Sequence, residues 1–141
     1  MVVGVDAELV EWSVDDVVQS EDRIVSQSRA LLPAGSRAQL QREVDELDEK
    51  LRPLGLQTRL LVVERANSLA LYFICMTLAA VMSLRDQWRS QELSDIVGSL
   101  FTFLSRATRT VYVKRLTWPL SDYQRCSEFF RSVQGKQTIL L

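Results

Sequence analysis

Histidine is absent from this chain of 141 residues, and only two residues are cysteine. Without imidazole, the chain has neither the general base of Ser-His-Asp and Cys-His sites nor histidine ligands for a metal. Cys75 and Cys126 are too few for the disulfide network of a small secreted domain. The sequence therefore argues against most hydrolase and zinc chemistry, and it predicts a protein of the reducing intracellular compartment, the cytoplasm.

The sequence also lacks a glycine-rich phosphate-binding loop, and it does not start with the basic and long apolar regions of a signal peptide. Carboxylate pairs such as Asp15 with Asp16, or Asp45 with Asp48, could supply acid-base chemistry or hold Mg²⁺. These pairs fall on the polar faces of predicted helices, where solvated charge is ordinary. We therefore expect no enzyme activity and no catalytic, cofactor-binding or metal-binding residue. No small-molecule substrate is indicated.

The composition is that of an ordinary globular protein, with 47% hydrophobic and 25% charged residues. A chain of this length fits one domain with one hydrophobic core. We expect a single helical domain over residues 1–141, with loose ends at 1–12 and 136–141.

Apolar residues recur at helical spacing through most of the chain. Ser13, Ser36 and Ser121 each begin a pattern resembling a capping box, in which the serine oxygen accepts a backbone N–H of the first turn. Proline and glycine at 33–35 and 53–55 mark breaks. The predicted fold class is all-α, a bundle of about five helices, with a short strand or extended arm near 108–116. The predicted helices are 13–32, 36–52, 57–89, 91–106 and 121–134.

The block from Leu69 to Leu84 contains no charged side chain and lies between Arg65 and Arg85. A membrane-spanning helix needs about 20 apolar residues, whereas shorter apolar runs are more often buried core helices. The block is therefore predicted to be the buried central helix of the bundle.

An apolar stripe crosses the charged second helix at intervals of four, three and four residues, through Leu40, Val44, Leu47 and Leu51. This spacing is typical of a coiled-coil-like seam of about two heptads. The seam is predicted to bind a partner helix, and its alternative is packing on the chain's own Leu69–Leu84 block.

Acidic residues predominate in residues 1–56 and basic residues in 57–141. Arg106, Arg109 and Arg115 lie near interleaved aromatic residues and are predicted to contact an acidic protein surface. Their alternative is pairing with the acidic first half of the same chain. Nucleic acid is disfavoured because no recognised binding motif is present and the net charge is negative. Lipid headgroups are also less favoured.

These patterns together predict a non-catalytic helical protein-protein interaction module, acting as an adaptor, assembly subunit or regulator within a larger complex. Its partner would be another protein or its own copy in a homo-oligomer. The alternative function is a membrane-active helical bundle that exposes its apolar helix at 69–84 to lipid.

Overall fold

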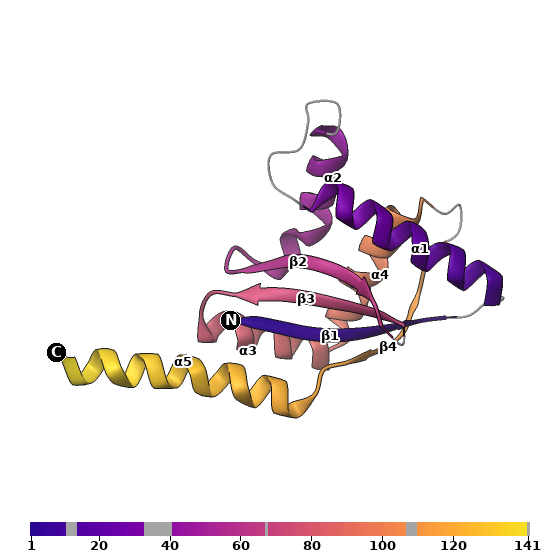
Figure 1. Ribbon diagram of the computed structural model, residues 1–141. Helices are drawn as coiled ribbons and strands as arrows, with labels where there is room; N and C mark the ends of the chain where they lie inside the picture. The colour runs from indigo at the N-terminus through magenta and orange to yellow at the C-terminus, as the bar shows by residue number, and fades with distance from the viewer. Residues whose placement is uncertain (11–13, 33–40, 67, 107–109, 141) are drawn as a thin grey trace.

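A computed structural model describes residues 1–10, 14–32, 41–66, 68–106 and 110–140. It combines helices with a four-stranded antiparallel sheet of order β2-β3-β1-β4 (Figure 1). The predicted all-α helical bundle is therefore wrong, and the fold is α/β. The elements are β1 (Val2–Leu9), α1 (Val14–Leu31), α2 (Gln41–Leu51), a 3-10 turn (Arg52–Leu54), β2 (Thr58–Arg65), β3 (Leu69–Cys75), α3 (Leu78–Arg89), α4 (Glu92–Ser105), β4 (Val113–Thr117) and α5 (Leu120–Leu140).

The largest correction concerns the helix predicted at 57–89. This stretch forms the hairpin β2-β3 followed by α3, so the apolar block at 69–84 is half strand and half helix. The hydroxyl of Thr77 accepts a hydrogen bond from the Ala80 N–H at 3.1 Å and caps the start of α3. The block is continuous because β3 carries apolar side chains on both of its faces and the first turns of α3 carry apolar side chains on both the buried and the exposed side.

The N-terminal residues expected to be loose instead form β1, in the middle of the sheet between β3 and β4. Alternate side chains of β1 enter the core, and each is at most 3% exposed: Val3, Val5, Ala7 and Leu9. This alternation is the period-two pattern of a strand with one buried face.

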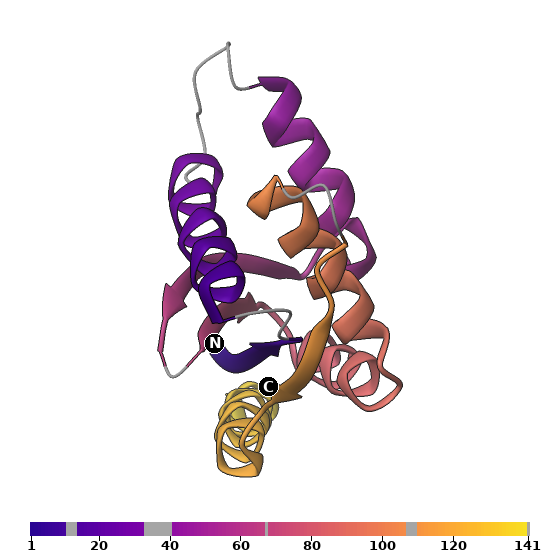
Figure 2. The same cartoon turned by 90° about the vertical axis from the view of Figure 1, so that its right-hand side faces the viewer.

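The core lies between the sheet and the helices that cover one of its faces. In Figure 1, α3 and α4 lie behind the strands, and none of the drawn helices crosses in front of β2, β3 and β1. In Figure 2, α1 and α2 lie above the sheet and α5 lies below it. Most of the largest buried side chains come from the strands and from α4, among them Leu71, Phe73, Leu93 and Phe101, and α1 and α3 add Ile24 and Leu84.

The helical periodicity locates the remaining elements well. The helices predicted at 13–32 and 91–106 correspond to α1 and α4, and α2 occupies the second part of the range 36–52. The arm predicted near 108–116 corresponds to β4, and the last helix continues to Leu140. Of the two edge strands, β4 is short and mostly polar, whereas β2 has eight residues and is apolar from Leu60 to Val63.

Candidate functional site

The predicted seam on α2 faces the protein's own interior. Leu47 is only 3% exposed, and Val44 and Leu51 are half-buried against the same core. The helix α2 packs on α4 rather than on the 69–84 block. Leu40 lies outside the described residues. The part of the stripe that the structure describes, Val44, Leu47 and Leu51, therefore packs within the domain.

The structure describes two of the three predicted partner-binding arginines, Arg106 at the end of α4 and Arg115 on β4. The Arg106 guanidinium, just after α4, pairs with the Glu43 carboxylate on α2 and also donates to the Gln27 side chain at 3.3 Å. This contact joins the basic second half to the acidic first half. Arg115 is exposed on β4. Arg109 lies outside the described residues.

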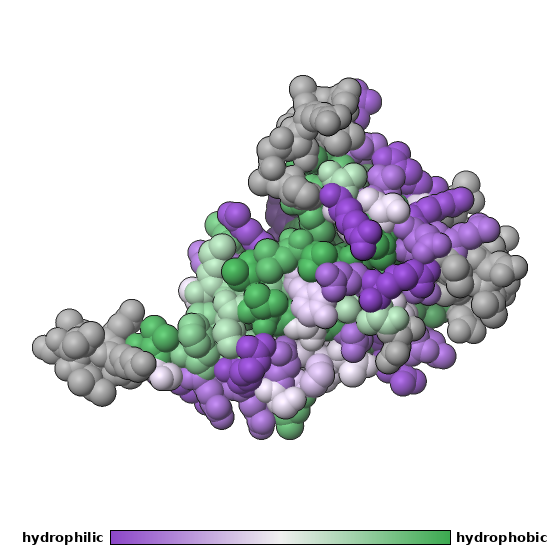
Figure 3. Space-filling view, in the orientation of Figure 1, coloured by the Kyte–Doolittle hydropathy of each residue, from purple (hydrophilic) through white to green (hydrophobic). Residues whose placement is uncertain are grey.

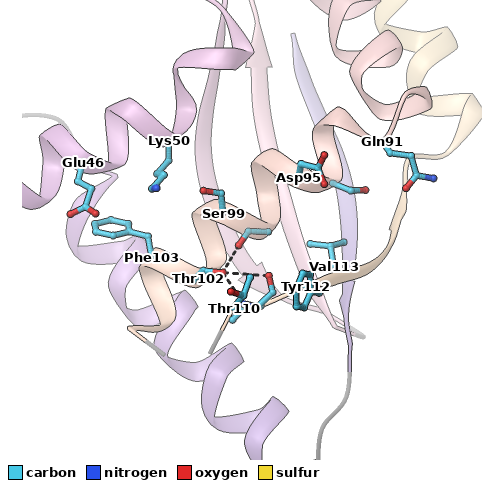
Figure 4. Close-up of a pocket in the computed structure, with 13 residues that line it drawn as sticks. Glu46, Lys50, Gln91, Asp95, Ser99, Thr102, Phe103, Thr110, Tyr112 and Val113 are labelled. Atoms are coloured by element: carbon cyan, nitrogen blue, oxygen red, sulfur yellow. Dashed lines mark hydrogen bonds between the residues drawn. The ribbon is translucent and has the colours of Figure 1, made fainter. Parts of the chain in front are cut away.

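A groove of about 520 Å³ lies between α2, α4 and the segment leading into β4 (Figure 4). Its floor includes Gly98, where an added Cβ would be 3.3 Å from the Val111 carbonyl oxygen. Glu46 and Lys50 line one wall, and the exposed ring of Tyr112 lies at the opposite side. The groove is lined by both polar and apolar side chains.

The central polar side chain of this groove, Thr102, is already fully engaged. Its hydroxyl accepts from the Val111 N–H at 2.8 Å and donates to the Gly98 carbonyl at 2.8 Å (Figure 4). The carboxylates of Glu46 and Asp95 are on exposed residues. These hydrogen bonds therefore hold α4 against the segment that leads into β4. The groove residues that the structure describes do not form a set of buried polar groups that could bind a ligand.

A different surface stands out on the uncovered side of the sheet. The pairing of β2 with β3 shifts between Leu60 and Val62, which leaves Leu61 as the extra residue of a β-bulge. Leu60 and Val63 are both buried, at 7% and 0% exposed. The two residues between them, Leu61 and Val62, therefore both face away from the core.

We call the resulting apolar surface the outer sheet face. It consists of Val2 and Gly4 on β1, Leu61 and Val62 on β2, and Tyr72 and Ile74 on β3. Leu61 is 45% exposed and Val2 is 41% exposed. Figure 3 shows a large apolar area over β2 and β3 on this side of the molecule.

The helix α5 borders the outer sheet face along β1, beyond the point where β4 ends. The Asp122 carboxylate accepts hydrogen bonds from the Gly4 N–H at 3.3 Å and from the Trp118 indole N–H at 2.9 Å. The Arg125 guanidinium donates to the Val2 carbonyl at 3.0 Å. These contacts attach α5 to the edge of β1, and the helix exposes further apolar area at Phe129 and Val133.

The two thiols are buried and serve as core side chains. Cys75 and Cys126 are each 0% exposed, and neither forms a disulfide. Burial raises the pKa of both thiols above the ordinary value. Because the thiolate is the nucleophile, a raised pKa makes both residues poorly reactive.

The described part of the chain contains no group of three acidic or cysteine side chains placed to hold a metal ion. Among the helices of that part, none is long and apolar enough to cross a membrane. The membrane-active alternative required one apolar helix over 69–84, and the structure divides that block between β3 and α3. No family model, curated protein or solved structure matches this chain.

Sequence reasoning missed the outer sheet face, although two signals for it were present. Val3, Val5, Ala7 and Leu9 alternate with less apolar residues at the start of the chain, which is the strand pattern. The run Leu60 to Val63 is apolar at every position, so a strand here must expose some apolar side chains unless both of its faces are covered.

Proposed function

We propose that this protein is a non-catalytic protein-interaction module, serving as an adaptor, assembly subunit or regulator, and that it binds its partner through the outer sheet face. The observation that carries the proposal is the exposure of Leu61 on the edge strand β2 and of Val2 at the start of β1, two large apolar residues that stay 45% and 41% exposed within the sheet. Contiguous exposed apolar surface of this kind is typical of interaction sites.

The physical reason is the free energy available on covering this surface. Removing apolar area from water is favourable by about 25 cal/mol per Å². Leu61 and Val62 face outward because the bulge adds one residue to β2, so the exposed apolar area follows from the backbone register. The half-buried ring of Tyr72 lies between them and β1, and tyrosine is a side chain enriched in protein interfaces.

The partner surface proposed from the sequence thus moves from the α2 seam to the sheet. Leu47 is buried and Arg106 is paired within the chain, so neither supports an external contact. We propose that the protein works inside the cell, and its two unpaired thiols support this proposal.

Site-specific photo-crosslinking tests this proposal. A photoreactive amino acid replaces Leu61 in one variant and Met82 in another, and both variants are irradiated in cells that normally express the protein. Met82 is the matched control because it is 44% exposed on α3, which lies behind the sheet. We expect a protein adduct from position 61 and none from position 82. Equal adducts at both positions, or none at position 61, would contradict the proposal.

A further inference from the structure

Resting on the proposed function, we infer that the occupant of the outer sheet face is a second copy of this chain, related by a two-fold axis. The evidence is the arrangement of charge at the two ends of the apolar surface. Arg59 is exposed at one end of β2 and Glu64 at the other. Neither makes an ion pair with any residue that the structure describes.

Both side chains point to the same side as Leu61. Arg59 lies between the buried residues Thr58 and Leu60, and Glu64 follows the buried Val63. Successive strand residues point to opposite faces, so both charges border the outer sheet face. They cannot pair with each other, because the five residue steps from Arg59 to Glu64 place their backbones roughly 16 Å apart.

The sheet register shows what lies beside each charge. Arg59 is the register partner of Ile74 on the neighbouring strand β3, and Ile74 lies opposite Val2 on β1. Glu64 pairs with Ala70, which lies opposite the exposed Asp6. One end of the surface is therefore basic and apolar, and the other end is acidic.

Such a surface is complementary to itself when a second copy is turned end for end. The two sheets pack face to face, and the two-fold axis lies between them and runs perpendicular to the strands through their middle. This axis places β2 of one copy over β2 of the second copy with the strand direction reversed. Arg59 then meets Glu64 of the second copy, and the same contact forms again by symmetry. The apolar side chains Leu61, Val62 and Tyr72 meet their own kind at the centre.

A second two-fold arrangement of the same two sheet faces is disfavoured by the same charges. A two-fold axis parallel to the strands would place β2 on β1 of the second copy without reversing direction. Glu64 would then face Asp6 of the second copy, and like charges brought together at an interface are unfavourable. The charge pattern therefore selects the end-for-end dimer.

The test measures the self-association of the full chain by sedimentation equilibrium. We expect dimers for the unsubstituted chain, association that is about tenfold weaker for Arg59→Glu or Glu64→Arg alone, and recovery of affinity in the double variant that carries both changes. Leu61→Glu should give monomers, whereas Met82→Glu should stay dimeric. Circular dichroism of each variant confirms that the fold is retained.

In the sedimentation experiment, two results would overturn the inference: a monomeric unsubstituted chain, or a double variant that associates no better than the single ones. The crosslink at position 61 separates this failure from failure of the proposed function. An adduct of two identical chains supports the dimer. An adduct with a different protein overturns the dimer and leaves the interaction module standing, and the absence of any adduct at position 61 overturns both.

Discussion

The ring of Tyr72 on β3 lies against Gly4, its partner on β1. A Cβ added at position 4 would be 3.2 Å from Cε1 of this ring, closer than an ordinary van der Waals contact. The glycine therefore lets the aromatic ring lie flat across the neighbouring strand. This contact is part of the outer sheet face, where the ring shape decides how closely another surface can approach.

The first prediction follows from this contact. Gly4→Ala should change the free energy of unfolding by less than about 1 kcal/mol, because the half-buried ring can tilt outward and alanine restricts the unfolded chain. The tilted ring should nevertheless weaken association. Urea denaturation and sedimentation equilibrium measure the two effects. Loss of stability without loss of association would contradict the prediction.

The second prediction compares two leucines of the 69–84 block. Leu71 is 0% exposed in the central strand β3, whereas Leu78 is half-buried at the start of α3. Leu71→Ala should destabilise the fold by about 2 to 5 kcal/mol through lost burial and the cavity left behind. Leu78→Ala should cost clearly less. Chemical denaturation of both variants checks the order, and equal losses would show that the two sites are equally packed.

The third prediction concerns α2. Leu47→Asp places a carboxylate at a position only 3% exposed, where an unpaired charge is strongly unfavourable. We expect a large loss of helical circular dichroism and of the cooperative unfolding transition. The neighbouring exposed residue Glu46 supplies the control, since Glu46→Asp should unfold like the unsubstituted chain. A folded Leu47→Asp variant would show that α2 can separate from α4.

The fourth prediction uses the buried Glu21 of α1. Burial raises the pKa of its carboxyl above the ordinary 4.5, Arg65 opposes this shift and Asp22 adds to it. The folded chain thus holds this proton to a higher pH than the unfolded chain. The stability that protonation contributes is complete below pH 4.5 and is lost as the pH rises through the folded pKa.

Glu21→Gln removes this titration and imitates the protonated carboxyl. Relative to the unsubstituted chain, the variant should be equally stable at pH 4 and more stable at pH 7. Denaturant unfolding at both values measures the difference. A variant less stable at pH 7 would show that the Arg65 contact, at 3.7 Å from Glu21, outweighs the cost of burial.

The sequence was sufficient for elements whose periodicity is carried by one buried face. In α4, buried residues such as Leu93, Ile96 and Leu100 recur at helical spacing, and this pattern alone defines the helix. The strand β4 was found from a different signal: the β-branched stretch 108–114 runs into it, whereas the burial of β4 itself does not alternate. Local patterns of this kind do not depend on what the rest of the chain does.

The sheet itself could not be predicted because β2 and β3 carry apolar side chains on both faces. Leu69, Leu71 and Phe73 point into the core, but Tyr72 and Ile74, which point to the opposite face, are also apolar. Without polar alternation, a short apolar run is equally compatible with a buried helix. The exposed apolar surface that makes the candidate site thus also hid it, since it removed the alternation that identifies a strand.

The side-chain contacts along β4 have a further consequence for how the protein can assemble. Open sheet edges invite other chains to add strands without limit, which leads to fibres. Here the Thr102 hydroxyl binds the Val111 N–H beside β4, and the Trp88 indole N–H donates to the Leu116 carbonyl at 3.0 Å. The bulge at Leu61 interrupts the opposite edge. Growth through either edge is hindered, so association through the sheet face would stop at a closed pair.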